Sequence, residues 1–254
     1  MTRPPQATAA MVLRLGALAL LMAFLVAPQR FAPVFAPLNA YGAAPIYDQG
    51  NLLKLAISHL VTVLVAAAAS TLVAVALAIF VTRPAGAPFR PLSRTLVNVG
   101  QTFPPVAVLA VTVPIVGFGQ LPTLIALFAY GLLPIFENTL AGLASVPRTV
   151  LDAADGMGLD ARQRLWQVEL PLALPLILEG VRLSLVISVG TATIGSTVAA
   201  KGLGEVIIAG LQSNNLAFVL QGGLIVAALA VLIYDALSAV ERYAARRMGQ
   251  GISA

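Results

Sequence analysis

The chain has 254 residues, of which 59% are hydrophobic and only 10% are charged. Soluble domains carry roughly 25% charged residues, so a soluble protein of this length has too little polar surface, whereas a lipid bilayer accommodates such a chain. The formal net charge of +5 is then typical of the loops of a membrane protein and does not imply nucleic acid binding.

Apolar stretches without acidic or basic residues predict the membrane-spanning helices, because about 20 mainly apolar residues cross the hydrocarbon core. The uncharged run 95–136 is long enough to cross twice, and the sequence GFGQLPT (117–123) supplies its turn. Six transmembrane helices are therefore expected, at about 12–28, 55–82, 96–117, 121–141, 172–200 and 216–240. The predicted fold class is an all-α polytopic membrane protein.

The first stretch has two interpretations. It begins with a basic segment and continues with a short apolar run followed by small residues, which is also typical of a signal peptide. No clear small-x-small cleavage site follows, which favours a retained helix. Cleavage would leave five spans with the same loops inside.

The distribution of Lys and Arg predicts the orientation, because short cytoplasmic loops carry an excess of them. If the N-terminus is cytoplasmic, twelve of these residues lie on or near that side, namely Arg3, Arg14, Arg83, Arg90, Arg94, Arg148, Arg162, Arg164, Arg182, Arg242, Arg246 and Arg247. Arg30, Lys54 and Lys201 fall outside. Both termini are therefore predicted to be cytoplasmic, in a multi-pass protein of a bacterial-type plasma (inner) membrane.

Several chemistries are excluded by what the chain lacks. There is no Cys and a single histidine, His59, which excludes Cys-based metal sites, zinc clusters and serine triads. Lys54 precedes Leu and Lys201 precedes Gly, so neither belongs to a P-loop, in which Lys precedes Ser or Thr. No cofactor or metal is expected on this chain, and it has no ATP site of the P-loop type. A membrane-embedded enzyme is the alternative of another class, but the chain offers no credible nucleophile–base pair.

Charge gathers in the segment 142–171, between the fourth and fifth predicted spans. Ser145 followed by Pro147 signals a helix start, and Gly158 is a natural stop for a helix that runs to about Met157. Asp160 with Gln163 forms a capping box for a second helix. The segment is predicted to be a helix–turn–helix outside the bilayer.

This charged segment also carries apolar side chains: Met157, Leu159, Leu165 and the single tryptophan, Trp166. One interpretation is a docking surface for a partner protein, because aromatic side chains commonly anchor an interface. The alternative is an ordinary amphipathic loop that rests on the bilayer surface. The residues by themselves favour neither.

The spacing of Asp152-Ala153-Ala154, Gly158 and Val168-x-Leu170-Pro171 resembles the EAA motif of binding-protein-dependent ABC transporter permeases, with Asp in place of the usual Glu. The resemblance implies a type I ABC importer permease (MetI-like) helical bundle, whose coupling helix inserts into a groove of a separate ATPase subunit. The residues assigned to ATPase coupling are Asp152, Ala153, Ala154, Gly158, Leu165, Trp166, Leu170 and Pro171.

Further segments resemble the osmoprotectant branch of that family, whose permeases carry glycine betaine, choline, carnitine or related solutes: SHLVTVLVAAAASTLVAVALAI, LPTLIALFAYGLLPIFENTLAGL, GMGLDARQRLWQVELPLALPLILEGVR and GTATIGSTVAAKGLGE. The resemblance implies uptake of such a quaternary-ammonium solute, with another small solute such as an amino acid as the alternative. The sequence departs from the pattern of this branch at two positions. Glu137 stands where a basic residue is expected, and Lys201 stands where a small residue is usual.

The resemblance covers about residues 50–245, which divides the chain into an N-terminal segment (1–50) and a permease domain (51–245). The partners that it implies are two ATPase subunits, an extracytoplasmic solute-binding protein, a second permease copy or paralogue, and membrane lipid.

Ser184, Ser188, Thr191 and Gly195 share one face of the fifth predicted helix, since they are spaced by four, three and four residues. They either line a translocation path or form a small-residue helix contact.

Polar residues elsewhere in the apolar stretches are interpreted more simply. Glu179 and Arg182 are expected to pair, Glu137 to pair with an arginine or act in a gate, and His59 to form a hydrogen bond near an interface. The segment KGLGE (201–205) is expected to form a turn or re-entrant loop.

Overall fold

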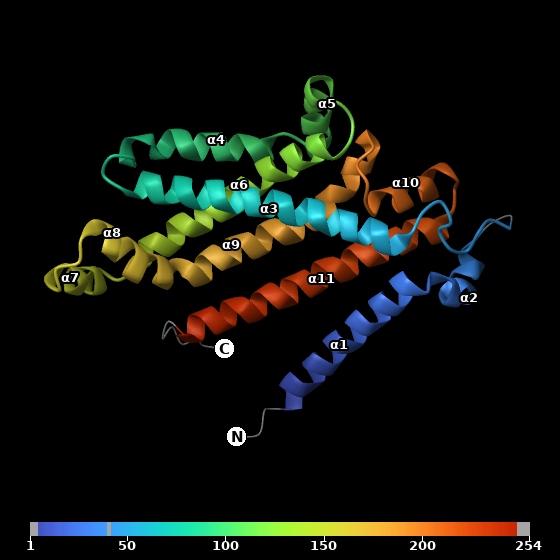
Figure 1. Ribbon diagram of the computed structural model, residues 1–254, viewed down its shortest axis with the longest axis horizontal. Helices are drawn as coiled ribbons and strands as arrows, with labels where there is room; N and C mark the ends of the chain where they lie inside the picture. Colours follow the sequence, from blue (N-terminus) through green and yellow to red (C-terminus); the bar gives the residue numbers. More distant parts are fainter. Residues whose placement is uncertain (1–4, 40–41, 248–254) are drawn as a thin grey trace. The chain divides into compact units, whose positions relative to one another are not determined.

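The computed structural model describes residues 5–39 and 42–247, and these residues form helices, turns and loops without any strand (Figure 1). The first third contains α1 (Pro5–Val26), η1 (Pro28–Phe31), α2 (Ala32–Phe35), η2 (Ala36–Leu38) and α3 (Leu52–Thr82). The middle third contains η3 (Ala87–Phe89), α4 (Arg90–Thr102), α5 (Pro105–Val116), α6 (Gln120–Ala144), α7 (Arg148–Gly156) and α8 (Ala161–Arg164). The last third contains η4 (Leu165–Glu169), α9 (Leu170–Thr191), η5 (Ala192–Val198), α10 (Gly204–Gln212) and α11 (Leu216–Arg247). The all-α class predicted from the sequence is confirmed.

The chain divides into two compact units. The first unit consists of Met1–Val63, Leu109–Leu124 and Val189–Leu232, and the second consists of Leu64–Val108, Ile125–Ser188 and Ile233–Ala254. The first unit takes residues from three separate parts of the chain, and the division into an N-terminal segment (1–50) and a permease domain (51–245) stays a prediction.

In the first unit, two buried amides hold the loop before α3 against the start of α11. Asn215 donates to the Ala44 carbonyl at 3.0 Å, and its side-chain oxygen accepts from the amide of Ala217 at 3.0 Å. Gln221 donates to the Pro45 carbonyl at 2.8 Å and accepts from the amide of Tyr47 at 3.1 Å. Because buried backbone groups need partners, these side chains fix an irregular loop that has no secondary structure of its own.

In the second unit, α3, α4 and α6 share an apolar core, and α4 runs beside the end of α3 (Figure 1). The buried residues of this core are Ala74, Ala78, Val81, Val97, Ile135, Phe136 and Leu140. Small residues on α3 allow the close approach, because alanine adds little between two backbones. The core positions the end of α6, from which the charged segment 142–171 leaves.

Helices α6 and α9 pack through small residues in the second unit. A Cβ atom on Gly142 would lie 3.0 Å from the carbonyl oxygen of Ala173, and one on Gly180 would lie 2.8 Å from that of Pro134. A side chain at Gly180 would overlap the Pro134 carbonyl, and one at Gly142 would require Ala173 to shift, so glycine at both positions allows the two helices to approach closely. This is the small-residue contact by which membrane helices associate.

Four helical stretches of the described residues are long and apolar enough to cross a membrane, and up to six if each sharply bent pair counts as one span. The four are Leu52–Thr82, Gln120–Ala144, Ala161–Val198 and Leu216–Arg247, which agrees with the predicted spans 55–82, 121–141, 172–200 and 216–240. The predicted span 12–28 corresponds to α1, after which the chain bends by 110° into Pro28–Leu38.

The predicted span at 96–117 corresponds to a pair of helices with a sharp bend between them. The chain bends by 96° between Ala87–Thr102 and Pro105–Val116. Pro104 and Pro105 lie at this break, where two ring-constrained residues withhold backbone donors and disfavour a helical residue before them. Pro114, in contrast, is accommodated inside α5.

The connection after the fifth span contains a helix that the sequence analysis missed. A turn follows Val198, with Ala199 in the left-handed region at φ 64°, and α10 then begins at Gly204. A Cβ on Gly204 would lie 2.0 Å from the Thr193 carbonyl oxygen. The expected turn at KGLGE is therefore present, and it leads directly into a short helix.

Candidate functional site

The charged segment 142–171 begins where α6 ends. The Ser145 hydroxyl donates to the Gly142 carbonyl at 2.8 Å, and Pro147 has an extended conformation (φ −61°, ψ 137°) before α7 begins at Arg148. Ser145 thus bonds back to α6, and Pro147 stands at the N-cap of α7, where no side chain caps the helix. The predicted helix start after Ser145 is confirmed.

The turn between α7 and α8 depends on Gly158 and Asp160. Gly158 has φ +79°, a left-handed conformation that favours glycine after a helix, and the Leu159 amide closes the turn by donating to the Ala154 carbonyl at 3.2 Å. The Asp160 carboxylate accepts from the amides of Arg162 and Gln163, both at 2.8 Å, while the Gln163 side chain accepts from the Asp160 amide at 2.9 Å. The predicted glycine stop and capping box are confirmed, and α7 ends at Gly156, one residue before the predicted end.

A network of ion pairs ties α7, α8, η4 and α3 together within the second unit. Arg164 donates to both oxygens of Asp155, at 2.6 and 2.8 Å, and to Glu169 Oε1 at 3.2 Å. Arg83, at the end of α3, binds the same Glu169 with both terminal nitrogens. Glu169 is buried, and two guanidinium groups compensate the cost of burying its charge.

Other residues of the motif hold the segment against the rest of the second unit. Ala154 is buried, and Leu165 and Leu170 pack against a small core of Leu143, Ala173 and Ile177. Pro171 is half-buried at the start of α9. These four motif residues thus pack within the chain; their assignment to ATPase coupling stays a prediction.

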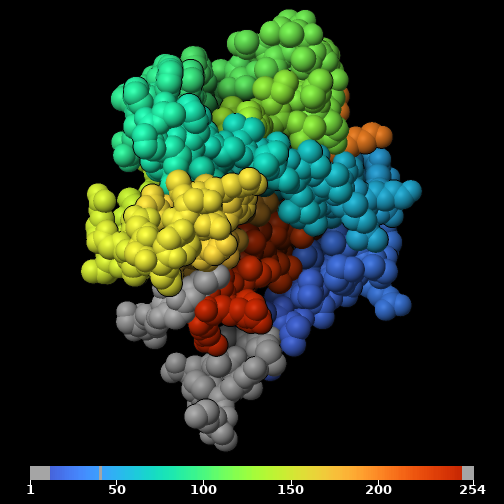
Figure 2. All heavy atoms as spheres, turned by 60° about the vertical axis from the view of Figure 1, so that its left-hand side comes forward, coloured from blue at the N-terminus to red at the C-terminus, as the bar shows by residue number. Residues whose placement is uncertain are grey.

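Four other residues of the segment are exposed, namely Asp152, Ala153, Met157 and Trp166, which we together call the coupling surface (α7 and α8 are yellow-green to yellow in Figure 2). Met157 is 73% exposed and Trp166 is 63% exposed. Large apolar side chains so exposed outside the expected spans, on helices held by the network described above, are typical of a site that a partner covers.

A cavity of about 580 Å³ lies beside this segment within the second unit. Its charged lining residues are Arg83, Arg90, Arg148, Arg164 and Glu169. Arg90 and Arg148 are exposed and make the cavity positively charged, since the other charged groups are compensated by the network. The Lys and Arg distribution predicts that these arginines lie on the cytoplasmic side. It does not predict that they line one cavity, because they come from separate helices.

The four residues proposed for a translocation path are divided between the two units. Ser184 and Ser188 are buried in the second unit, where a Cβ on Gly131 would lie 2.7 Å from the hydroxyl oxygens of both Ser184 and Ser70. Thr191 is half-buried and Gly195 is buried in the first unit, where Thr123 leaves no room for a side chain at Gly195. The arrangement supports the helix-packing alternative at Ser184 and Gly195, and the path itself stays a prediction.

The ionisable residues of the apolar stretches have partners. Glu137 pairs with Arg94 at 2.5 Å. Arg182 lies 3.7 Å from Glu179, as expected, but its shorter contact, at 2.5 Å, is with Glu241 on α11. His59 is buried and forms a 2.9 Å hydrogen bond with the Val189 carbonyl. The arginine pairs belong to the second unit and His59 to the first, and the bonding of each supports a structural role.

Comparison with known proteins agrees with the motif. Residues 74–250 match the family described as binding-protein-dependent transport system inner membrane component. The chain is 41% identical over 191 residues to the osmoprotectant import permease protein OsmY of Salmonella typhimurium, covering 75% of this chain and 80% of that protein. It is 35% identical over 206 residues to the glycine betaine/carnitine/choline transport system permease protein OpuCB of Bacillus subtilis, covering 80% and 93%. The choline transport system permease protein OpuBB of Bacillus subtilis is 35% identical over 193 residues, covering 76% and 88%.

Among solved structures, the fold is similar to that of a chain of the MetNI methionine ABC transporter, with a TM-score of 0.68 and 22% identity, covering 76% of this chain and 95% of that one. At this identity the likeness concerns the fold, and it confirms the predicted MetI-like bundle. Members of the matched family work in systems with a solute-binding protein and an ATPase, and they are transport permeases rather than enzymes. The chain therefore belongs to the family of binding-protein-dependent transport system inner membrane components and is a permease subunit of an ABC importer.

Proposed function

We propose that this permease imports quaternary-ammonium osmoprotectants such as glycine betaine or choline. The observation that carries the proposal is the similarity to osmoprotectant and choline permeases, at 35–41% identity over about three quarters of the chain or more. An importer of another small solute, such as an amino acid, has no such support, because the likeness to the methionine transporter is at 22% identity.

The permease supplies a low-affinity path, and the binding protein supplies most of the selectivity. Quaternary ammonium groups are recognised by aromatic faces, but aromatic residues are 6% of this chain, and Trp166 lies on the coupling surface. The path along Ser184, Ser188, Thr191 and Gly195 offers small side chains without a cation cage. The purified permease should therefore bind betaine no more tightly than about millimolar, roughly −4 kcal/mol.

The coupling surface receives the ATPase subunit. Asp152 and Ala153 are exposed, as are the apolar Met157 and Trp166. A groove of the ATPase can therefore bury the Trp166 ring and also contact the Asp152 carboxylate. ATP is bound by that subunit and no cofactor by this chain. A second copy or a paralogue completes the membrane pore, and both termini face the cytoplasm together with residues 142–171.

The test is uptake by the complete transporter, reconstituted in vesicles with its ATPase and binding protein. Radiolabelled betaine, choline and methionine are offered separately, with and without ATP inside the vesicles. We expect ATP-dependent uptake of betaine or choline. Uptake of methionine alone would remove the osmoprotectant assignment and leave the permease assignment intact.

A further inference from the structure

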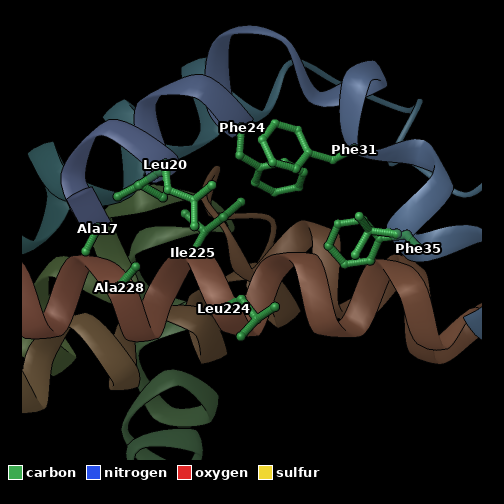
Figure 3. A pocket seen from close by; sticks show the side chains of 10 residues that line it. Ala17, Leu20, Phe24, Phe31, Phe35, Leu224, Ile225 and Ala228 are labelled. Atoms are coloured by element: carbon green, nitrogen blue, oxygen red, sulfur yellow. The ribbon is translucent and has the colours of Figure 1, made fainter. Parts of the chain in front are cut away.

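The first unit contains an apolar groove between α1, the bent segment that follows it, and α11 (Figure 3). Its volume is about 300 Å³, at the low end of the range for small-molecule sites. Leu21, Phe24, Phe35 and Ile225 are buried at its base, and Ala17 and Ala228 are among its walls. The side chains that line it are all hydrocarbon, so a ligand in it must also be hydrocarbon.

The rim of the groove is open toward the outside of the first unit. Leu20, Val34 and Leu224 line it, and each is more than half exposed. Leu18 and Met22 of α1 are also exposed apolar residues. In an inner membrane protein such a surface faces acyl chains, so lipid has direct access to the groove.

An exposed positive charge lies next in the chain to a residue that lines the groove. Arg30 is exposed, follows the end of α1, and precedes the groove residue Phe31 in the same short helix η1. Arg30 forms no ion pair with any residue of 5–39 or 42–247. The 110° bend after Val26 directs this segment away from the axis of α1, as expected where a chain leaves the hydrocarbon and follows the interface.

We propose that the groove binds a phospholipid, with one acyl chain along Phe24 and Ile225 and the headgroup phosphate at Arg30. A hydrocarbon-lined groove with an exposed guanidinium next to it in the chain matches an amphipathic anion. The transported solute does not fit this site. Phe24 packs edge-on against Phe31 at 5.2 Å and lies 5.6 Å from Phe35, so the rings contact one another instead of forming an open cage, and no carboxylate lines the groove.

The lipid fills the space between α1 and α11. The match to the permease family begins at residue 74, so α1 and its bend lie outside the matched residues. Figure 3 shows Ile225 of α11 pointing toward Leu20 of α1, and Phe24 and Leu224 line the same groove. An acyl chain between these side chains would bury apolar surface of both helices.

The test uses the complete transporter in vesicles of phosphatidylethanolamine and phosphatidylglycerol that contain a phosphatidylglycerol with a photoreactive acyl chain. We expect cross-links within residues 17–35 and 224–228. Ala228→Phe fills the groove and should lower the yield there by about tenfold, equivalent to about 1.4 kcal/mol of binding. Ala17→Phe fills the groove from the other helix and serves if the first variant does not assemble.

Two control variants match these changes. Val231→Phe adds the same ring to an exposed position of α11 outside the groove and should leave the cross-link unchanged. Arg30→Gln should lower the yield, whereas Lys54→Gln, which removes another exposed cation of the first unit, should not. Equal yields in the wild type, Ala228→Phe and Ala17→Phe would overturn the proposal. So would a disulfide between two copies carrying Ala228→Cys, because a second permease would then occupy the groove.

Discussion

At the scale of single residues, Trp166 carries the clearest consequence for coupling. It is the single tryptophan, it is 63% exposed, and it lies in η4, whose Glu169 is bound by Arg83 and Arg164. A buried aromatic anchor typically contributes about 2–4 kcal/mol to an interface. We expect Trp166→Asp to weaken binding of the ATPase by at least about 30-fold, measured by titration of the purified ATPase onto the permease in nanodiscs.

The matched control is Gln167→Asp. Gln167 is the next residue and is also exposed, so the variant introduces the same charge without removing the indole. It should retain ATPase binding and ATP-dependent uptake. Wild-type ATPase affinity in Trp166→Asp would show that Trp166 is not an anchor.

Residue-level signals predicted only part of this site. Gly158 and the pair Asp160 and Gln163 are local signals, because a turn and a cap involve residues within a few positions of each other. Glu169 and Arg83 are 86 residues apart in the chain, and no local pattern pairs them. The sequence therefore indicated where the helices begin and end, but not what fixes them to α3.

At the scale of elements, Glu169 joins η4 to α8 and to the end of α3. Removing one partner of a buried ion pair typically costs about 3–5 kcal/mol, and the partial exposure of Arg83 reduces this to about 2 kcal/mol. We expect Glu169→Gln to lower the unfolding temperature of the purified permease. We also expect it to reduce transport per ATP hydrolysed, because the coupling surface is no longer held to α3.

Glu137→Gln controls for the loss of one negative charge in the same unit. The pair of Glu137 with Arg94 is more exposed than that of Glu169, and water screens it. The unfolding temperature of the Glu137→Gln variant, and its transport per ATP hydrolysed, should stay near those of the wild type. If both variants behave alike, Glu169 has no special role in holding the segment.

Hydropathy located the membrane-spanning stretches but not the angle at which a stretch bends. Residues 96–117 satisfy the length and composition of a span, but hydropathy does not report direction, and Pro104 and Pro105 turn the chain by 96°. For the same reason α10 was not predicted. Hydropathy does not detect the turn at Ala199, whose backbone has a left-handed conformation, and this turn separates α10 from the preceding helix. The buried amides Asn215 and Gln221 were missed because their partners lie 171 and 176 residues away.

At the scale of the whole molecule, the family match and the charge pattern concern different questions. The match over residues 74–250 establishes a permease of the inner membrane, and the fold agrees with it. Neither determines which side the segment 142–171 faces. That inference depends on the twelve Lys and Arg assigned to one side against three on the other.

The orientation can be tested directly because the chain has no cysteine. Arg162→Cys places a thiol on α8, and Gln49→Cys places one in the exposed loop before α3. If the coupling surface is cytoplasmic, a membrane-impermeant maleimide labels Gln49→Cys in intact cells and labels Arg162→Cys only after permeabilisation. Both thiols should react in detergent, which checks that each is accessible. Labelling of Arg162→Cys from outside would reverse the topology and place the coupling surface beyond the reach of any cytoplasmic ATPase.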